Sequence, residues 1–159
     1  MGGFGAMNSA VHHPDIFGSV ISLAGYYTAE GSIWGQNTAY MQANSPAYVL
    51  PANPHAWKLR IFLGAATKDQ PYYADTQRFI LELKALHLNY TFDLENGYHT
   101  WSIWEAQLYH ALIWLQWREA SNGDCHTMNV AFSCKSLVQA VGCLWREKEF
   151  SGHGRARDE

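Results

Sequence analysis

The stretch Leu59-Arg60-Ile61-Phe62-Leu63-Gly64 is a short apolar run that ends at a glycine, and it predicts a buried strand near the middle of the chain. A comparable apolar run, Ser19–Gly25, lies upstream of it, and the alternating run Tyr90–Glu95 lies downstream. Apolar strands of this kind are typical of parallel sheets that are covered on both faces. The three runs therefore predict the sheet on which the rest of the chain is arranged.

A helix is predicted before the first of these strands. Residues Phe4–His13 are rich in small side chains and stop before Pro14, which is unfavourable inside a helix. Small residues at its start, Gly2, Gly3 and Gly5, predict close packing of this helix against the sheet.

Two further helical patterns follow the second and third predicted strands. One runs from Pro71 to about His87, and the other begins after residue 99. Their expected apolar faces consist of Phe79, Ile80, Leu83 and Leu86, and of Trp101, Trp104, Leu108, Leu112 and Leu115. We expect Trp101 and Trp104 to pack in the core. The alternation of strands and helices predicts an α/β fold whose parallel sheet has about three strands with flanking helices.

Residues 26–57 form a long excursion between the first two predicted strands. Proline and glycine interrupt it, and Ser45 followed by Pro46 predicts a helix start with Ser45 as its N-cap. Such a segment is typical of a lid or pocket wall, but an ordinary crossover with a few packed rings explains it equally well. Trp34 and Tyr40 are accordingly candidates for lining a substrate pocket, with packing at the surface as the alternative.

Composition narrows the class of protein. Of 159 residues, 48% are hydrophobic and 16% are charged, which favours a globular chain over a disordered one. The net charge is −3 and basic residues form no stripe, so no nucleic-acid partner is expected. Apolar runs stay below the roughly 18 residues of a membrane span. The first residues have neither the basic nor the apolar region of a signal peptide.

The last forty residues differ from the rest. Residues 1–119 carry the regular patterns, whereas 120–159 lack them and hold all three cysteines, Cys125, Cys134 and Cys143. Their spacing matches no zinc pattern, and we interpret them as incidental thiols. We therefore predict one domain over 1–119 and a non-homologous, weakly structured tail over 120–159.

Two chemically capable side chains follow the second and third predicted strands. Asp69 follows the second strand, and His99 follows the third, thirty residues later. Ligands of open parallel sheets meet the carboxyl ends of the strands. A carboxylate and a histidine in this order are two of the three groups of a serine hydrolase triad, in which the acid orients the base. An acid and a histidine on solvent-facing loops are the alternative interpretation.

The N-terminal residues relate this pair to a known family. Met1-Gly2-Gly3-Phe4-Gly5 is similar to the residues that follow the serine of a Gly-x-Ser-x-Gly elbow. The segment Gly97-Tyr98-His99-Thr100-Trp101-Ser102-Ile103-Trp104 resembles the motif Gly-x-His-[Ser/Thr]-Trp-x-x-Trp of the Putative esterase family, and Gly64–Asp69 resembles its acid loop. This family of α/β-hydrolases includes S-formylglutathione hydrolases, enterochelin-type esterases and secreted mycolyltransferase antigens. The resemblance covers residues 1 to about 118.

The resemblance implies roles for single residues. Asp69 would be the triad acid, His99 the general base, and the backbone N–H of Met1 a donor to the oxyanion. The chain would be the C-terminal half of an α/β-hydrolase domain, and its nucleophilic serine would precede Met1. Ser9 and Ser22 are candidate nucleophiles only without the family resemblance. No cofactor and no metal are expected, since the adjacent His12 and His13 point in different directions on a helix.

Three hypotheses on function follow. The first is a serine carboxylic-ester hydrolase that forms an acyl-enzyme, acting on a small-molecule or lipid acyl ester. The second is an inactive truncated product or a non-catalytic interaction chain, because the nucleophile is missing. The third is acyl transfer to a sugar acceptor. The family contains cytoplasmic and secreted members, so the compartment stays open, as does the oligomeric state.

Overall fold

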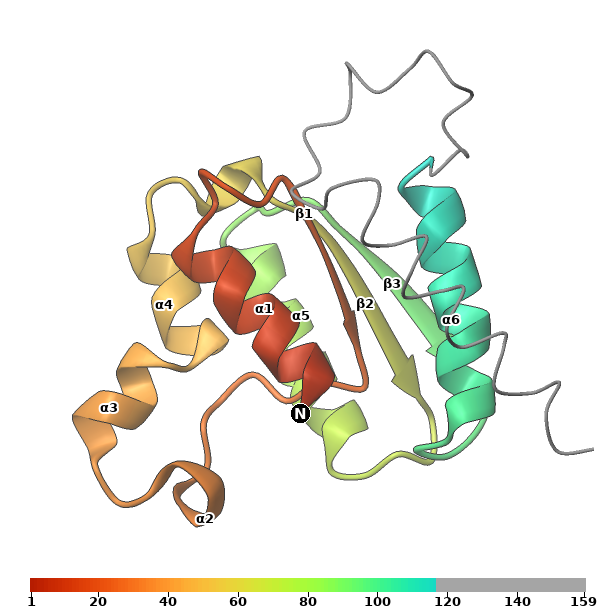
Figure 1. Ribbon diagram of the computed structural model, residues 1–159, viewed down its shortest axis with the longest axis horizontal. Helices are drawn as coiled ribbons and strands as arrows, with labels where there is room; N and C mark the ends of the chain where they lie inside the picture. The colour runs from red at the N-terminus through yellow and green to blue at the C-terminus, as the bar shows by residue number, and fades with distance from the viewer. Residues whose placement is uncertain (117–159) are drawn as a thin grey trace, which may run out of the picture. The chain divides into compact units, whose positions relative to one another are not determined.

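The computed structural model describes residues 1–116, and its elements alternate as the sequence predicts. Figure 1 labels most of them along the chain. In chain order they are α1 (Gly2–His12), β1 (Ser19–Leu23), α2 (Gly31–Trp34), α3 (Thr38–Ala43), α4 (Pro46–Ala52), the 3-10 turn η1 (Ala56–Lys58), β2 (Arg60–Ala66), α5 (Tyr72–Ala85), β3 (Tyr90–Glu95) and α6 (Trp101–Trp114).

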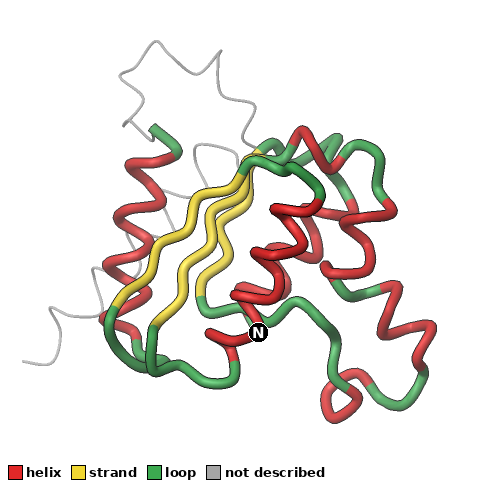
Figure 2. The backbone as a smooth tube through the Cα atoms, turned by 180° about the vertical axis from the view of Figure 1, so that it is seen from behind, coloured by secondary structure: helices red, strands yellow, loops and turns green. Residues whose placement is uncertain are grey.

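The three strands form one parallel sheet in the order β1-β2-β3. Its register pairs Val20 with Ile61, and Gly64 with Asp93. Figures 1 and 2 show α6 on one face of this sheet, with α1 and α5 on the other. The predicted α/β class is therefore confirmed, with three parallel strands and flanking helices within the described residues.

The main core lies between the sheet and the helices α1, α4 and α5. Alternate strand residues point into it, including Val20 from β1 and Ile61 and Leu63 from β2, as expected where side chains alternate between faces. The helices contribute Met7, Val11, Leu50, Phe79 and Leu83, all of which are fully buried. This core fixes the layers that position the loops at the carboxyl ends of the strands.

Several local predictions need correction. Leu86 is not buried: α5 ends at Ala85, and Leu86 is 38% exposed at its C-cap. Ser45 takes the N-cap position of α4 but does not cap it with its side chain. Its hydroxyl instead donates to the Met41 carbonyl and accepts from the Ala29 N–H, and so ties the excursion together.

The last helix uses a different face from the predicted one. Trp101 is 65% exposed and Leu108 is 42% exposed, whereas Gln107 and Ala111 are the buried residues of α6. The reason is local. Gly64 on β2 has no side chain, so the Gln107 amide lies directly over the sheet there. Its Nε2 donates to the carbonyls of Ala65 and Asp93.

No helix among residues 1–116 combines the length and apolarity needed to cross a membrane. The predicted boundary at residue 119 and the predicted tail over 120–159 lie outside the described residues and remain predictions.

Candidate active site

The loops after β2 and β3 are held side by side at the carboxyl end of the sheet. The parallel register pairs Ala66 with Glu95, the last residues of the two strands. Beyond them, the Thr67 N–H donates to the Glu95 carbonyl at 3.0 Å, and the Lys68 N–H donates to the Gly97 carbonyl at 2.9 Å. These bonds extend the ladder past the strands, so the residues that follow each loop are brought together.

Asp69 and His99 are the side chains that this arrangement joins. His99 Nδ1 lies 2.7 Å from Asp69 Oδ2. Because a carboxylate only accepts, the Nδ1–H donates, and Nε2 is left as the free nitrogen of the ring. The Asp69 side chain is 3% exposed and that of His99 is 42% exposed. A buried carboxylate thus orients a half-exposed imidazole, and the two predicted residues are brought into contact.

Two aromatic rings flank the imidazole. Tyr72 lies 4.9 Å from the His99 ring, and Trp104 lies 4.7 Å from it in an edge-on arrangement, both measured between ring centroids. Trp104 comes from α6 and Tyr72 from the first turn of α5, directly after the acid loop. Tyr72 was not among the residues predicted from sequence patterns. Its position just behind Asp69 was the available signal.

The N-terminus of α1 approaches the end of β1 very closely. A Cβ placed on Gly3 would lie 2.5 Å from the Leu23 carbonyl oxygen, so only glycine fits there. The predicted close packing is therefore correct at Gly3, but it is wrong for Gly2 and Gly5, where a Cβ would meet nothing within 4 Å. The Ser22 hydroxyl also donates to the Gly3 carbonyl at 2.9 Å and fixes the helix end to the strand.

Ser22 belongs to a buried hydroxyl pair. Its Oγ lies 3.1 Å from the Tyr27 hydroxyl, and burial raises the pKa of Tyr27 to about 12, so the phenol stays protonated at neutral pH. Tyr27 itself is stacked on Phe79, and its backbone N–H donates to Asp75. Ser22 is fully buried and bonded in this way, which makes it a structural hydroxyl rather than a nucleophile.

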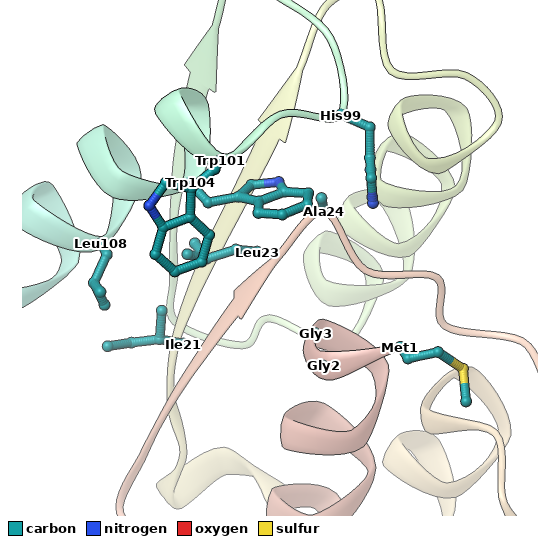
Figure 3. Close-up of a pocket in the computed structure, with 10 residues that line it drawn as sticks. All are labelled: Met1, Gly2, Gly3, Ile21, Leu23, Ala24, His99, Trp101, Trp104 and Leu108. Carbon is teal, nitrogen blue, oxygen red and sulfur yellow. The ribbon is translucent and has the colours of Figure 1, made fainter. Parts of the chain in front are cut away.

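An open cleft of about 400 Å³ connects these parts. Met1, Gly2 and Gly3 line one end of it together with His99. Figure 3 shows the Trp101 and Trp104 side chains on the side of the cleft away from Met1. The remaining lining is apolar: Ile21, Leu23, Ala24 and Leu108. Two indoles that were predicted to lie in the core are therefore walls of the cleft.

Trp34 and Tyr40 lie elsewhere. Neither belongs to the lining of the cleft. Trp34 packs on Phe4 at 5.3 Å and on Tyr40 at 6.0 Å, and its Nε1 is buried without a hydrogen-bond partner within the described part of the chain. The cluster continues to Tyr26, whose hydroxyl donates to the Met1 sulfur. These rings therefore pack around the start of α1, behind the residues that line the cleft.

Comparison with known families identifies the chain. The family model described as Putative esterase matches residues 1–115, which is most of the chain. The chain belongs to the Putative esterase family. The resemblance predicted from the Gly-Gly start and the histidine motif is therefore confirmed.

Solved structures share the fold of this esterase-family chain. FphF, a fluorophosphonate-binding serine hydrolase of Staphylococcus aureus, matches with a TM-score of 0.63 and 19% identity, over 72% of this chain and 50% of its own. The S-formylglutathione hydrolase FrmB of the same organism matches with a TM-score of 0.56 and 23% identity, over 72% and 51%. The capsule O-acetyltransferase of Neisseria meningitidis serogroup A gives 0.59 and 15%, over 72% and 52%.

The chain spans about half the length of these structures. At such identities the likeness concerns the fold alone. No curated protein sequence matches the chain.

Proposed function

We propose that this chain supplies the acid and the base of an ester hydrolase site that works through a serine acyl-enzyme. One observation carries the proposal: the buried Asp69 carboxylate accepts a hydrogen bond from His99 Nδ1 at the edge of a cleft that Met1, Gly2 and Gly3 also line. A hydrolase needs a nucleophile beside such a base, and an oxyanion donor beside the nucleophile. Membership of the Putative esterase family supports the same chemistry.

The reaction follows from the free nitrogen of His99. In the first step His99 Nε2 takes the proton of a serine hydroxyl, whose oxygen attacks the ester carbonyl. Asp69 holds the ring by its Nδ1–H and stabilises the imidazolium that forms. His99 then protonates the departing alcohol, which leaves an acyl-serine. Water, deprotonated by the same nitrogen, releases the acid and restores the serine. No cofactor takes part in these steps.

The nucleophile is proposed to be the residue immediately before Met1. Among residues 1–116, those that line the cleft include no serine, threonine or cysteine, and Ser22 is fully buried and hydrogen-bonded to the Gly3 carbonyl. Met1 is the N-cap of α1, which places its backbone nitrogen at the start of a helix that borders the cleft. With a preceding residue, this nitrogen would be a peptide N–H that donates to the oxyanion. A helix start also favours the developing negative charge.

The substrate is proposed to be a small-molecule or lipid acyl ester. Most residues that line the cleft are apolar or aromatic, and such a lining suits an acyl chain or an aromatic group better than a charged one. Trp34 and Tyr40 remain proposed substrate-binding residues only for a substrate that extends past Met1, since neither lines the cleft itself.

The proposal is tested at the position before Met1. We expect the natural codons upstream of Met1 to read Gly-x-Ser in frame, and the chain extended by its upstream residues to hydrolyse p-nitrophenyl acetate. Residues 1–159 alone should give background turnover, because losing the serine of a triad costs about a millionfold. In the extended chain, His99→Ala should abolish turnover, whereas His55→Ala, at an exposed position whose side chain forms no hydrogen bond in the described structure, serves as the matched control.

Two outcomes would redirect this proposal. If residues 1–159 alone exceed background and lose that activity with His99→Ala, the nucleophile lies within the chain. If the upstream codons hold a stop, the chain is an inactive product or acts by association only.

Acyl transfer to a sugar is the second candidate, because the capsule O-acetyltransferase shares this fold. The test measures how much of the acyl group is released to water and how much is transferred to an added sugar alcohol. If transfer to the sugar exceeds hydrolysis at millimolar sugar, the result favours this candidate.

A further inference from the structure

A second cluster of ionisable side chains lies outside the lining of the cleft. It consists of Asp93 and Glu95 on β3 and His110 on α6. His110 Nδ1 lies 2.9 Å from Asp93 Oδ2 and 3.9 Å from Glu95 Oε1. One donor atom from each residue lies within 4.8 Å of the other two, and within residues 1–116 no other set of three or more His, Cys, Asp and Glu residues meets this criterion.

The fold explains why these three side chains converge. Asp93 and Glu95 are two residues apart on a strand, so both point to the face of the sheet that carries α6. His110 lies on α6 and points back toward them. One turn earlier, the fully buried Gln107 donates to the Asp93 carbonyl and holds the strand against the helix. The two carboxylates are thus presented by a backbone that is already fixed.

The charges of the cluster do not balance. Two carboxylates share one face, and His110 is the single ion-pair partner that either of them has in the described part of the chain. A neutral histidine leaves two negative charges, and a protonated histidine still leaves one. The cluster therefore has a net negative charge that an added cation would offset.

We propose that Asp93, Glu95 and His110 bind a divalent first-row metal ion. Carboxylate oxygens and an imidazole nitrogen are hard-to-intermediate donors. Mn²⁺ and Zn²⁺ bind to such donors and do not need a thiolate ligand. Metal–ligand bonds of about 2.0–2.2 Å require donor atoms roughly 3 to 3.5 Å apart, so the Glu95 side chain must move inward by about 1 Å. Glu95 and His110 are partly exposed, which leaves room for this movement and for water ligands.

None of Asp93, Glu95 and His110 belongs to the lining of the cleft beside the proposed catalytic pair. His110 lies nine residues after the first residue of α6, which is about 14 Å along the helix axis. The ion would link β3 to α6, and the only fully buried residues of α6 are Gln107 and Ala111. We therefore assign the ion a structural role, which is to hold α6 against the sheet. The proposal departs from the sequence-based expectation of no metal, because residues 93, 95 and 110 form no metal-binding spacing in sequence.

Mn²⁺ is the probe for this proposal, because it prefers oxygen and nitrogen donors and so limits binding to the three cysteines. Binding is measured on residues 1–159 by the loss of the electron paramagnetic resonance signal of free Mn²⁺. Its location is measured by the broadening of backbone amide signals in nuclear magnetic resonance spectra. We expect about one ion per chain at this site, and the earliest broadening at residues 93–95 and 110.

Variants decide between a metal site and a simple ion pair. Asp93→Asn and His110→Ala should each weaken Mn²⁺ binding by more than about tenfold, whereas His55→Ala removes a histidine elsewhere and should leave binding unchanged. Glu95→Gln, which keeps the Asp93–His110 contact, should also weaken it. Uniform broadening, no binding at millimolar Mn²⁺, or binding unaffected by Glu95→Gln would overturn the proposal. Circular dichroism of each variant separates loss of the site from loss of the fold.

Discussion

The two faces of the sheet are built differently. On one face, α1, α4 and α5 cover alternate strand residues such as Ile61 and Leu63, which are completely buried. On the other face, α6 contacts all three strands, and strand residues Ile21 and Leu23 remain only half-buried in the wall of a cleft. The first face therefore forms a tightly packed core. The second is the face on which both the cleft and the Asp93, Glu95 and His110 cluster lie.

The composition of α6 sharpens this contrast. Its apolar residues are spread around the whole helix, a pattern typical of a helix that is buried on all sides. In the described structure, however, Trp101, Tyr109 and Ile113 are exposed. The solved relatives are about twice as long as the part that this chain matches. We therefore expect the covered face to determine the stability of residues 1–116, and the open face to tolerate change.

The largest expected effect is on the covered face. Phe79 is buried and stacks on Tyr27 with ring centroids 4.1 Å apart, so Phe79→Ala leaves a large cavity in the main core. It should lower the free energy of unfolding by about 3–5 kcal/mol, measured by urea denaturation. A cost below that of Leu108→Ala on the open face would show that the two faces do not differ as described.

A smaller effect is expected where α6 contacts the sheet. Gly64→Ala places a Cβ 2.7 Å from Gln107 Oε1 and should cost about 1–3 kcal/mol. The same substitution in a Gln107→Ala background should cost less, by at least about 0.5 kcal/mol, because the clash with the amide is gone. If the two costs in unfolding free energy are additive in this double-mutant cycle, the space at Gly64 is not what accommodates the Gln107 amide.

The smallest effect is expected at the exposed surface of α6. Leu108 is 42% exposed, and Leu108→Lys should change the unfolding free energy of residues 1–159 by no more than about 0.5 kcal/mol. The same substitution in the chain extended upstream of Met1 provides the comparison. A much larger loss of unfolding free energy in the extended chain would show that additional polypeptide covers this face. An equal loss would show that the face is exposed in both chains.

The regular elements were predictable from local patterns. The Tyr90–Glu95 strand has the predicted bounds, and the predicted helix over residues 71–87 is observed as Tyr72–Ala85. Apolar runs and helical periodicity are local signals, and each of these elements carries its own. The short helices α2 and α3 were not predicted, because they are four and six residues long and bury none of their own residues.

The packing of α6 was the main failure of prediction. Periodicity favoured its tryptophans and leucines as the buried face, but Gln107 and Ala111 are the residues that are buried. The controlling feature is Gly64, which lies 43 residues earlier and provides the space that the amide fills. A contact between residues so far apart in sequence leaves no periodic signal in either segment.

The sequence by itself determined the alternation of strands and helices, the family, and the choice of Asp69 and His99 as candidate residues. These depend on short-range patterns and on motifs of a few residues. Only the tertiary structure decided that the two side chains are 2.7 Å apart, that Tyr72 and Trp104 flank the imidazole, and that Asp93, Glu95 and His110 converge. The physical reason is the register of the parallel sheet and the seating of α6 on it, which fix distances between residues that the chain itself keeps far apart.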